Sequence, residues 1–454
     1  MNAVLKTSSH PQSLDLAAFK LKATAAEPFI AKIPGSKSYT NRALVLAAQR
    51  MGRTEIVGAL HSEDTDLLAA CLNAFGGLAV EKTQQGFTVV RTSEELTAPE
   101  KPVFVGGGGT PARLLIAFAA MAKGETTVDG NARLRERPMG DLLDALTGMG
   151  VQFRCLATEG CLPVKITGGV AIEKTAWRVN ASKSSQFLTS LLLLAAQQKQ
   201  PVTVQVDGDL VSKSYVEMTL QIMRDCGLRV EHEALRTFTV WPGMPNKSTI
   251  HIEVDASAMS YFAAAAALTR TTVVIPGITQ SSKQGDAQFA TLMGKMGASV
   301  VWHADSVEVK GVTLRGITVD MDTMPDTVLT LAAVASQAEG NTRVTNIANL
   351  KIKECDRIHA IEAELNRLGS HAVGGDDSVD VRPTDTLTPG SVQTYNDHRV
   401  AMAFSLLGLV HDGIRIEDPK CVEKSFPSYW TELARFVAHH NQGSGPAPAM
   451  GSAA

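Results

Sequence analysis

The sequence predicts a mixed α/β protein of two domains, each built from three similar α/β units. Its 454 residues are more than one hydrophobic core usually serves, which favours two domains. Five amphipathic helical segments each end at a glycine and lead into a strand-like segment. The glycines recur at intervals of 74, 77, 70 and 72 residues, at Gly76, Gly150, Gly227, Gly297 and Gly369. This even spacing, rather than the common helix–glycine–strand succession itself, indicates an internal repeat.

A sixth unit and the intervening strands complete this prediction. A helix over residues 429–439 follows at about the right distance but without the glycine, as a terminal repeat often does. β-branched segments such as VTVQVDG and TTVVIPGI lie between the helices and are bounded by Gly, Pro or Asp. Six mixed α/β units are therefore expected, three in each domain.

The stretch IPGSKSYTNRAL places a cation and hydroxyls beside a helix start. A Pro-Gly turn precedes a helix predicted to begin around residues 39–41, and Lys37, Ser38 and Arg42 lie at or near that start. Unpaired N–H groups and the positive end of the helix dipole favour an anion there. The stretch is no P-loop, because it lacks the Gly-Lys pair and the earlier glycine. Taken alone, it is also explained as a cap with solvated charges.

The stretch VFVGGGGTPARLL predicts a glycine-rich turn between a strand and a helix. Pro111 suits the first turn of that helix, and the glycines would let the backbone approach a ligand closely. The surrounding pattern does not match a dinucleotide-binding fingerprint. A phosphate cradle and a plain turn explain the stretch equally well.

Two further helix starts carry polar groups. Arg135 and Arg137 precede a predicted proline-initiated helix, and arginine suits bidentate capture of carboxylate or phosphate. Ser184, Ser185 and Gln186 precede a helix that is apolar on most sides, which suits a hydroxylated ligand. Ordinary capping explains either start when it is taken alone.

The stretch NLKIKECDRIHAIEAEL combines an acid with two cations. On a helix, Lys353 and Arg357 would share a face and Glu354 would lie against Arg357. A carboxylate held between cations would stay ionised unless burial opposes it, and it could move a proton. The alternative is a solvated, salt-bridged helix face.

Three more starts repeat the arrangement. Asp326 follows a proline at the start of a strongly apolar helix, where an acid is either a cap or a buried base. Asp397, His398 and Arg399 precede another apolar helix, and Lys424 precedes a proline in the same manner. One polar helix start is a cap, whereas six or seven with Lys or Arg indicate a converging anion site. We therefore expect small polyanions to bind between the domains.

Composition excludes several other classes. The net charge of −3 disfavours binding to nucleic acid through a broadly basic surface. Six scattered cysteines without a CxxC pair disfavour a zinc site or a disulfide framework. The apolar runs fall short of a membrane span, and the N-terminus lacks the apolar core of a secretory signal. We expect a soluble cytoplasmic chain with no membrane partner and a disordered tail over residues 441–454.

The quoted motifs resemble the 5-enolpyruvylshikimate-3-phosphate synthase family of enolpyruvyl transferases over residues 32–436. The matching stretches, in order, are PGSKSYTNRAL, RERPMGDLLDAL, SSQFLTSLLL, GDLVSKSYVEMTL, DASAMSYFAAAAAL, MPDTVLTLAAVA, IKECDRI, YNDHRVAMAFSL and DPKCVEKSFPSYW. The resemblance implies an inside-out α/β barrel of six βαβαββ repeats in two domains. One domain would be discontinuous, 1–34 plus 253–440, and the other would span 35–252.

The resemblance also implies a reaction and its residues. The enolpyruvyl group of phosphoenolpyruvate would pass to the 5-hydroxyl of shikimate 3-phosphate by addition and elimination of phosphate, in a monomer that needs no metal or organic cofactor. The residues expected to be catalytic are Asp326, as base for the 5-hydroxyl, Glu354, as proton donor to C3, and Lys37. The residues expected to hold shikimate 3-phosphate are Lys37, Ser38, Arg42, Ser184, Ser185, Gln186, Ser212, Tyr215, Asp326, Asn349 and Lys353. Those expected to hold phosphoenolpyruvate are Lys37, Gly109, Arg137, Gln186, Arg357, His398, Arg399 and Lys424.

Two alternatives stay open on the sequence. A UDP-N-acetylglucosamine enolpyruvyl transferase would share the architecture but has Lys-Asn where this chain has Lys37 and Ser38. A non-catalytic phosphate-binding paralogue would have lost Asp326 or Glu354, and both are present. An ATP-dependent kinase is disfavoured by the missing Walker pattern.

The glycine-rich stretch departs from the loop Gly-Asn-Ala-Gly-Thr-Ala-Met-Arg-Pro-Leu that the resemblance implies. Gly107 and Gly108 replace Asn and Ala, and Leu114 replaces Pro. The changes remove a side-chain hydrogen bond near phosphoenolpyruvate, add backbone freedom and release the helix behind the loop. We expect weakened inhibition by glyphosate.

Overall fold

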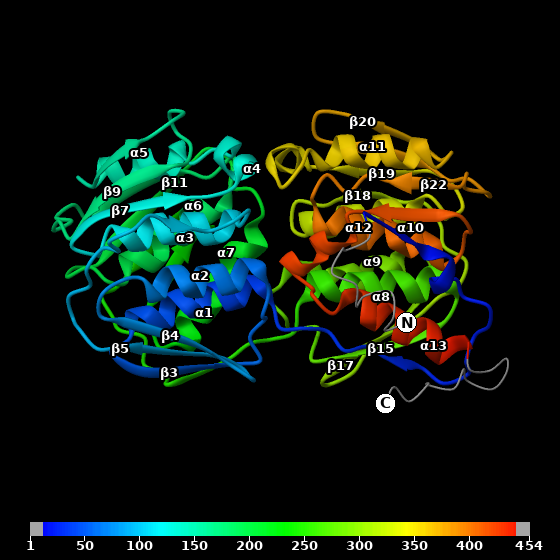
Figure 1. Ribbon diagram of the computed structural model, residues 1–454, viewed down its shortest axis with the longest axis horizontal. Coiled ribbons are helices and arrows are strands. Elements are labelled where there is room, and N and C mark those ends of the chain that lie inside the picture. Colours follow the sequence, from blue (N-terminus) through cyan, green and yellow to red (C-terminus); the bar gives the residue numbers. More distant parts are fainter. Residues whose placement is uncertain (1–11, 442–454) are drawn as a thin grey trace.

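The computed structural model describes residues 12–441, which form two lobes side by side (Figure 1). The central lobe comprises the elements from α1 to β14, in the middle of the chain. The terminal lobe comprises β1, η1 and β2 together with the elements from α8 to α13. The predictions for the N-terminal end and for the C-terminal tail mainly concern residues 1–11 and 442–454. These residues lie outside the part of the chain that the structure describes. Asn441 was assigned to that tail but ends helix α13 (Tyr429–Asn441).

Three four-stranded sheets belong to the central lobe. In order across each sheet, the strands are β14 (Thr249–His251), β3 (Gly52–Val57), β5 (Gly86–Arg91) and β4 (Leu78–Thr83); β6 (Val103–Phe104), β7 (Gly124–Asp129), β9 (Val164–Gly168) and β8 (Gln152–Cys155); and β10 (Ala176–Asn180), β11 (Val202–Asp207), β13 (Thr237–Val240) and β12 (Val230–Glu233). The helices are α1 (Lys37–Gln49), α2 (Glu63–Asn73), α3 (Gly109–Ala119), α4 (Ala132–Glu136), α5 (Gly140–Gly148), α6 (Ser185–Ala195) and α7 (Lys213–Asp225).

The terminal lobe also has three sheets. Their strands, in order, are β2 (Phe29–Ile30), β15 (Thr272–Pro276), β17 (Ser306–Lys310) and β16 (Ser299–Trp302); β18 (Thr318–Asp320), β19 (Thr342–Thr345), β21 (Val379–Arg382) and β20 (His371–Gly374); and β1 (Ser13–Asp15), β23 (Ile414–Glu417) and β22 (Gly390–Val392). Besides α13, the α-helices are α8 (Ala256–Thr269), α9 (Gln288–Lys295), α10 (Val328–Ala335), α11 (Arg357–Arg367) and α12 (His398–Ser405). The 3₁₀ turns are η1 (Leu16–Phe19), η2 (Gly285–Ala287), η3 (Pro325–Thr327), η4 (Ala348–Ile352), η5 (Leu406–Leu409) and η6 (Pro419–Lys424).

The six sheets are the predicted repeats. In each four-stranded sheet the first strand runs parallel to the second, and the other pairings are antiparallel. The sixth sheet has three strands: β22 runs parallel to β23, and β1 from the other end of the chain pairs antiparallel to β23. The terminal unit therefore departs from the repeat in its strands as well as in its missing glycine.

Within each lobe the helices lie between the sheets (Figure 1). Strand β11 shows why, since its valines are buried and the alternate Thr203 and Gln205 are exposed. Each sheet thus turns one face to solvent and one to the helices. Helix α6 matches this position because its residues are buried on all sides except Gln186. The buried helices α1, α3, α6, α8, α10 and α12 lie inside and the sheets lie outside, which gives the inside-out arrangement, while the other longer helices each leave one side exposed.

Four of the five repeat glycines take the left-handed backbone that the helix ends require, and one prediction is wrong. The φ angles of Gly150, Gly227, Gly297 and Gly369 are +96°, +81°, +120° and +79°. At the first helix the residue with positive φ is Gly77, at +91°, instead of its neighbour Gly76. Two adjacent glycines gave the sequence no means of choosing between them.

The chain crosses between the lobes twice, and the two crossings bind each other. The N–H of Ser36 donates to the carbonyl of Glu253 at 2.8 Å, and the N–H of Asp255 donates to the carbonyl of Pro34 at 2.8 Å. Immediately after the crossings, α1 and α8 begin at their caps Ser36 and Asp255. The crossings therefore fix the starts of one helix in each lobe.

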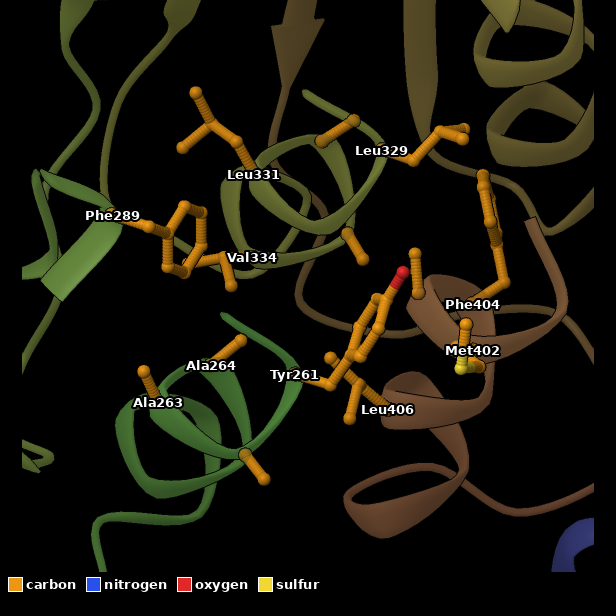
Figure 2. Packing of buried hydrophobic residues seen from close by; sticks show 14 of the residues in the cluster. Tyr261, Ala263, Ala264, Phe289, Leu329, Leu331, Val334, Met402, Phe404 and Leu406 are labelled. Carbon is orange, nitrogen blue, oxygen red and sulfur yellow. The ribbon is translucent and has the colours of Figure 1, made fainter. Parts of the chain in front are cut away.

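The terminal-lobe core holds the helices that reach the site. Figure 2 shows Tyr261 of α8 close to Phe404 of α12, and Leu329 of α10 nearby. Small residues such as Ala263 and Ala264 let α8 sit deep in this core, fully buried. Among the described residues, no helix has both the length and the apolar character needed to cross a membrane.

Candidate active site

The polar helix starts of both lobes converge on one cavity. The predicted site residues that line it are Lys37, Ser38, Gly109, Arg137, Ser184, Ser185, Gln186, Ser212, Tyr215, Asp326, Asn349, Lys353, Glu354, Arg357 and Arg399. Three other predicted residues, Arg42, His398 and Lys424, do not line this cavity. The accumulation of polar starts in the sequence therefore corresponds to one place in the structure.

Helix α1 begins earlier than predicted, so that Lys37 lies in its first turn. Ser36 caps the helix by accepting the N–H of Tyr39 at 3.4 Å, so α1 begins at Lys37 and not around residues 39–41. Lys37 pairs with Asp64 at 3.2 Å, while its backbone N–H donates to Asp255 at 3.0 Å. The cation thus stands in the first turn of the helix, next to the chain crossing.

Arg42 lies behind the cavity instead of facing it. Its side chain is buried, and its nitrogens donate to the carbonyls of Ser38 at 2.9 Å and Tyr215 at 3.0 Å and to the hydroxyl of Thr219 at 2.8 Å. Burial lowers its pKa to about 10. In this structure Arg42 supports two residues of the cavity wall, and the expected contact with a ligand remains untested.

Helix α6 presents hydroxyls and an amide. Ser184 caps it by accepting the N–H of Gln186 at 3.2 Å. The side-chain oxygen of Gln186 accepts from Arg113 of α3 at 2.6 Å, and the carbonyl of Pro138 accepts from the same arginine at 3.1 Å. Arg113 therefore holds the amide of Gln186 toward the cavity.

The glycine-rich stretch forms the predicted strand-to-helix turn. Gly106 takes a φ of +60°, and α3 begins at Gly109 with Pro111 in its first turn. A Cβ on Gly109 would come within 2.7 Å of the Arg137 guanidinium and 2.8 Å of Arg113. A side chain at this position would have to displace the guanidinium groups of both arginines.

Arg135 does not join the site, although it stands next to Arg137 in the motif. Arg135 belongs to α4 and pairs with Asp129 at the surface. The helix that follows begins at Gly140, after Pro138, so it is not initiated by the proline as predicted. The turn after α4 sends the two arginines in different directions.

Asp326 is the centre of the terminal-lobe wall. Its carboxylate is paired with Arg399 at 2.7 Å, Arg357 at 3.1 Å and Lys353 at 3.5 Å. From the opposite lobe, the Tyr215 hydroxyl donates to it at 3.1 Å. Burial raises the pKa of Asp326, but the three cations more than offset this effect and hold the pKa well below its ordinary value. Asp326 is therefore an ionised base.

Glu354 is enclosed by cations from both lobes. It pairs with Arg357 at 3.0 Å, Lys424 at 3.4 Å and Arg137 at 3.7 Å. Burial raises its pKa, and these cations, led by Lys424, lower it well below the ordinary value. The predicted continuous helix is wrong: η4 ends at Ile352 and α11 begins at Arg357, which leaves Glu354 on a loop. The expected pairing with Arg357 nevertheless exists.

Lys424 and His398 lie close to Glu354. Lys424 lines an adjoining cavity of about 500 Å³ and donates to the carbonyl of Gly107 at 3.1 Å. His398 is fully buried, and both of its ring nitrogens lack a hydrogen-bond partner. Burial and the nearby Lys37 and Arg399 hold the pKa of His398 well below its ordinary value, so its imidazole is neutral.

Several buried polar atoms of the site have no hydrogen-bond partner within the described residues. They include the Nε and Nη1 of Arg137, the Nε of Arg113, the Oδ1 of Asn349 and the Oδ1 of Asp64. Buried groups of this kind are normally satisfied, so a cluster of them indicates hydrogen bonds reserved for a ligand.

The cavity is cationic although the chain is acidic overall. It is lined by seven cationic side chains, Lys37, Arg113, Arg137, Lys183, Lys353, Arg357 and Arg399, against three acids, Asp64, Asp326 and Glu354. The open space is only about 50 Å³, because acids and cations fill the centre. Contacts also join the lobes, such as Asn349 to the Ser212 hydroxyl at 3.0 Å. A polyanion must therefore displace these contacts to enter.

Sequence reasoning missed three acids near the cavity. Asp64 pairs with Lys37, Asp397 binds Arg357 at 2.8 Å, and Asp286 contacts the Ser257 hydroxyl. Asp397 stood in a quoted helix start and could have been identified as a buried counter-ion, while the other two had no local signal. Among residues 12–441, no group of three or more metal-ligating side chains is placed to hold a metal ion.

Comparisons with known proteins give one consistent result. A sequence model of the family described as EPSP synthase (3-phosphoshikimate 1-carboxyvinyltransferase) matches residues 28–433. The 3-phosphoshikimate 1-carboxyvinyltransferases of Hamiltonella defensa and Escherichia coli are 41% and 38% identical to this chain, over 88% and 89% of it and 94% and 95% of their own lengths. The EPSP synthase structure from Acinetobacter baumannii matches with a TM-score of 0.75 at 25% identity, covering 91% of this chain and 97% of its own. The enolpyruvyl transferase NikO from Streptomyces tendae matches in fold, with a TM-score of 0.70 at 17% identity, over 92% and 96% of the two chains.

Proposed function

Since the chain belongs to the EPSP synthase family and carries its 3-phosphoshikimate 1-carboxyvinyltransferase activity, we propose how the cavity performs the transfer. The carrying observation is that Asp326 and Glu354, whose side chains are only 17% and 12% exposed, share Arg357 while each also contacts a residue of the central lobe. Two acids so placed can act on opposite ends of one reacting system. The residue roles below are proposals that this geometry supports.

The central lobe binds shikimate 3-phosphate. Ser184, Ser185 and Gln186 offer hydroxyl and amide groups to a polyol, with Ser212, Tyr215 and Ser38 opposite them. Lys37 and Lys353 supply positive charge. Asn349 reaches the same space from the terminal lobe, and Arg42 stiffens Ser38 and Tyr215 from behind.

Phosphoenolpyruvate binds between the arginines. Arg137, Arg357 and Arg399 suit its carboxylate and phosphate, because guanidinium groups bind such oxyanions bidentately. The backbone of Gly109 at the α3 start, the amide of Gln186 and the cations Lys37 and Lys424 complete the pocket, with the neutral His398 beside them.

The oxygen of the 5-hydroxyl attacks C2 of phosphoenolpyruvate, and Asp326 takes the proton of that hydroxyl. Glu354 gives a proton to C3 in the same addition, with Lys37 nearby to stabilise the developing charge. The C2–O bond to phosphate then breaks while C3 gives a proton back to Glu354. The departing phosphate takes the proton held by Asp326, and the enolpyruvyl ether remains. No metal or organic cofactor takes part in this sequence of steps.

Glu354 must first acquire the proton that it gives. In the unliganded site its pKa is held low by Lys424, Arg357 and Arg137. Phosphoenolpyruvate brings several negative charges to the same cations and excludes water, which raises the pKa of Glu354. Binding of the substrate thus converts the ionised carboxylate into an acid.

The chain is proposed to work as a cytoplasmic monomer of two domains, 1–34 plus 253–440 and 35–252, that close on the first substrate. The hydrogen-bonded crossings at Pro34 and Glu253 provide the hinge. Opening separates Asp326 from Tyr215 and enlarges the 50 Å³ cavity for entry.

Glyphosate inhibition is proposed to be weakened by the altered loop. Gly107 has no side chain toward Asn131 and Lys424, where a Cβ would stand 2.9 Å and 3.0 Å away. The variant Gly107→Asn with Gly108→Ala, Pro111→Ala, Ala112→Met and Leu114→Pro restores the usual loop and should lower the glyphosate inhibition constant. An inhibition constant already as low as in enzymes with the usual loop rejects the proposal.

The function is tested by measuring phosphate release. Phosphate should appear only when shikimate 3-phosphate and phosphoenolpyruvate are supplied together. Release from phosphoenolpyruvate alone, or no release from the pair, contradicts the proposal. Replacing shikimate 3-phosphate with UDP-N-acetylglucosamine should give no phosphate.

A further inference from the structure

Arg133 bridges the two lobes beside Glu354. It lies on α4 of the central lobe, and its Nε donates to the backbone carbonyl of Glu354 at 3.1 Å. Its Nη2 donates to the carbonyl of Lys353, also at 3.1 Å. The remaining nitrogen, Nη1, bonds Glu136 on the same helix at 2.8 Å. All three guanidinium nitrogens therefore have partners, and two of them cross to successive residues of the other lobe.

The segment that Arg133 holds lies outside regular structure. Residue 352 ends η4 and Arg357 begins α11, so Lys353 and Glu354 stand on the loop between them. Carbonyls on such a loop depend on donors from outside their own element. The planar fork of arginine matches two neighbouring acceptors, whereas a lysine ammonium acts as a single point charge.

This contact does not depend on the charge of the Glu354 side chain. The pairs of Glu354 with Arg357, Lys424 and Arg137 weaken when its carboxylate is protonated, because they are ionic. The bonds from Arg133 go to backbone oxygens, which stay acceptors in both states. If Glu354 is the proton donor, as proposed above, Arg133 is the contact that persists through the proton cycle.

We propose that Arg133 is a positioning residue for the transfer: it clamps the loop of Lys353 and Glu354 across the closed lobes and holds the Glu354 carboxyl in place whichever protonation state it is in. It acts through the backbone and contacts neither substrate.

The clamp should affect turnover more than binding of the first substrate. Most groups proposed to hold shikimate 3-phosphate belong to the central lobe and do not contact Arg133. Misplacing an acid by about 1 Å costs roughly 100-fold in rate. Arg133→Ala should therefore lower kcat by about 10- to 100-fold and change the dissociation constant of shikimate 3-phosphate much less, through Lys353 alone.

Arg135→Ala is the matched control. Arg135 lies on the same short helix and has its own surface pair with Asp129, but it makes no contact across the lobes. Its removal costs the same charge, so the two variants differ only in the clamp. Guanidinium ions added at millimolar concentration should restore part of the kcat of Arg133→Ala, whereas sodium chloride of equal ionic strength should not. Arg133→Lys should recover less than half of the loss.

The outcomes separate this proposal from the assignment of the reaction. A wild-type chain that releases no phosphate from the two substrates refutes the function itself. An active wild type with Arg133→Ala within about threefold of Arg135→Ala in kcat overturns the clamp. An equal fall in kcat and in shikimate 3-phosphate affinity, unaffected by guanidinium, also overturns it, because that result is expected of a merely structural residue.

Discussion

The two walls of the cavity are built from different chemistry. The central-lobe wall combines hydroxyl and amide side chains, such as Ser184 and Gln186 at a helix start, with the separate cations Lys37, Arg113, Arg137 and Lys183. The terminal-lobe wall is a network of ions in which Asp326 and Glu354 share Arg357. The hydroxyl and amide groups of the central-lobe wall can accept a polyol by exchanging a few hydrogen bonds. The charged wall must exchange its own acids for the charges of the substrate, so changes there should alter turnover and stability, and changes opposite should alter binding.

The largest expected effect comes from Glu354→Gln. The amide keeps the shape but cannot give a proton, and general acid catalysis contributes about 10²- to 10⁴-fold. We expect kcat to fall by that factor while calorimetry shows unchanged binding of shikimate 3-phosphate. Glu362→Gln on α11, the helix that follows the Glu354 loop, lies outside the cavity and is the control. Unaffected turnover would remove Glu354 from the mechanism and break the contrast between the walls.

The next effect concerns stability. Asp397 is fully buried and receives two bonds from Arg357, at 2.8 Å and 3.3 Å, besides capping α12. Asp397→Asn leaves the guanidinium with a neutral partner, and breaking a buried ion pair costs about 3 to 5 kcal/mol. The free energy of unfolding, measured with denaturant, should fall by roughly that amount.

The comparison variant for this effect is Asp380→Asn. Asp380 pairs with Arg343 at 2.6 Å, but both side chains are about half exposed. Exposed pairs contribute about 0 to 1 kcal/mol. Equal losses in the two variants would show that the terminal-lobe wall is not held by its ions.

A third effect concerns the pH dependence of stability at Asp286, where the two walls of the cavity meet. Asp286 is buried against the Ser257 and Tyr215 hydroxyls, close to Asp326, Arg399 and Asp255. Burial and the charge of Asp326, partly offset by Arg399, raise the pKa of Asp286 to about 7. An acid with a raised pKa favours the folded state fully below its unfolded value of about 4, and this contribution is lost as pH rises through the folded pKa.

The amide of Asp286→Asn cannot ionise, so the variant does not lose stability in this way as pH rises. Its side-chain oxygen can still accept a hydrogen bond from Ser257. The Tm of the variant minus that of the wild type should therefore increase between pH 5 and pH 8, reflecting about 1.4 kcal/mol for each unit by which the pKa is raised. Asp305→Asn, at an exposed site, should show no such trend. A constant difference across this range would mean that Asp286 is ionised throughout.

The sequence predicted the repeats better than it predicted the local geometry of the site. Periodicity and spacing located the helices, because a repeating apolar face depends on neighbouring residues. The loop at Glu354 was wrongly placed on a helix, since charge spacing alone does not reveal where a helix is interrupted. Arg135 and Arg137 looked equivalent two residues apart, and only the turn after α4 separates them.

Contacts between distant segments were beyond prediction. Asp64 contacts Lys37 only after α1 and α2 of the central lobe have packed together, and Arg133 contacts the 353–354 loop only where the two lobes lie against each other. Nothing within a few residues of either marks its partner. Arg42 shows the opposite error, because a cation predicted to bind a ligand instead donates hydrogen bonds to carbonyl oxygens of the protein.

The smallest effect tests the hydroxyl groups of the central-lobe wall with two adjacent serines. Ser184 caps α6, so Ser184→Ala should cost about 1 kcal/mol of stability as well as a ligand contact. Ser185 lies inside the first turn and caps nothing, so Ser185→Ala should leave the free energy of unfolding unchanged. Both should raise KM for shikimate 3-phosphate by about 3- to 10-fold, the worth of one hydrogen bond, with kcat within about twofold. A fall in kcat without a change in KM would mean that these serines contribute to turnover rather than to substrate binding. The proposed difference between the two walls would then be wrong.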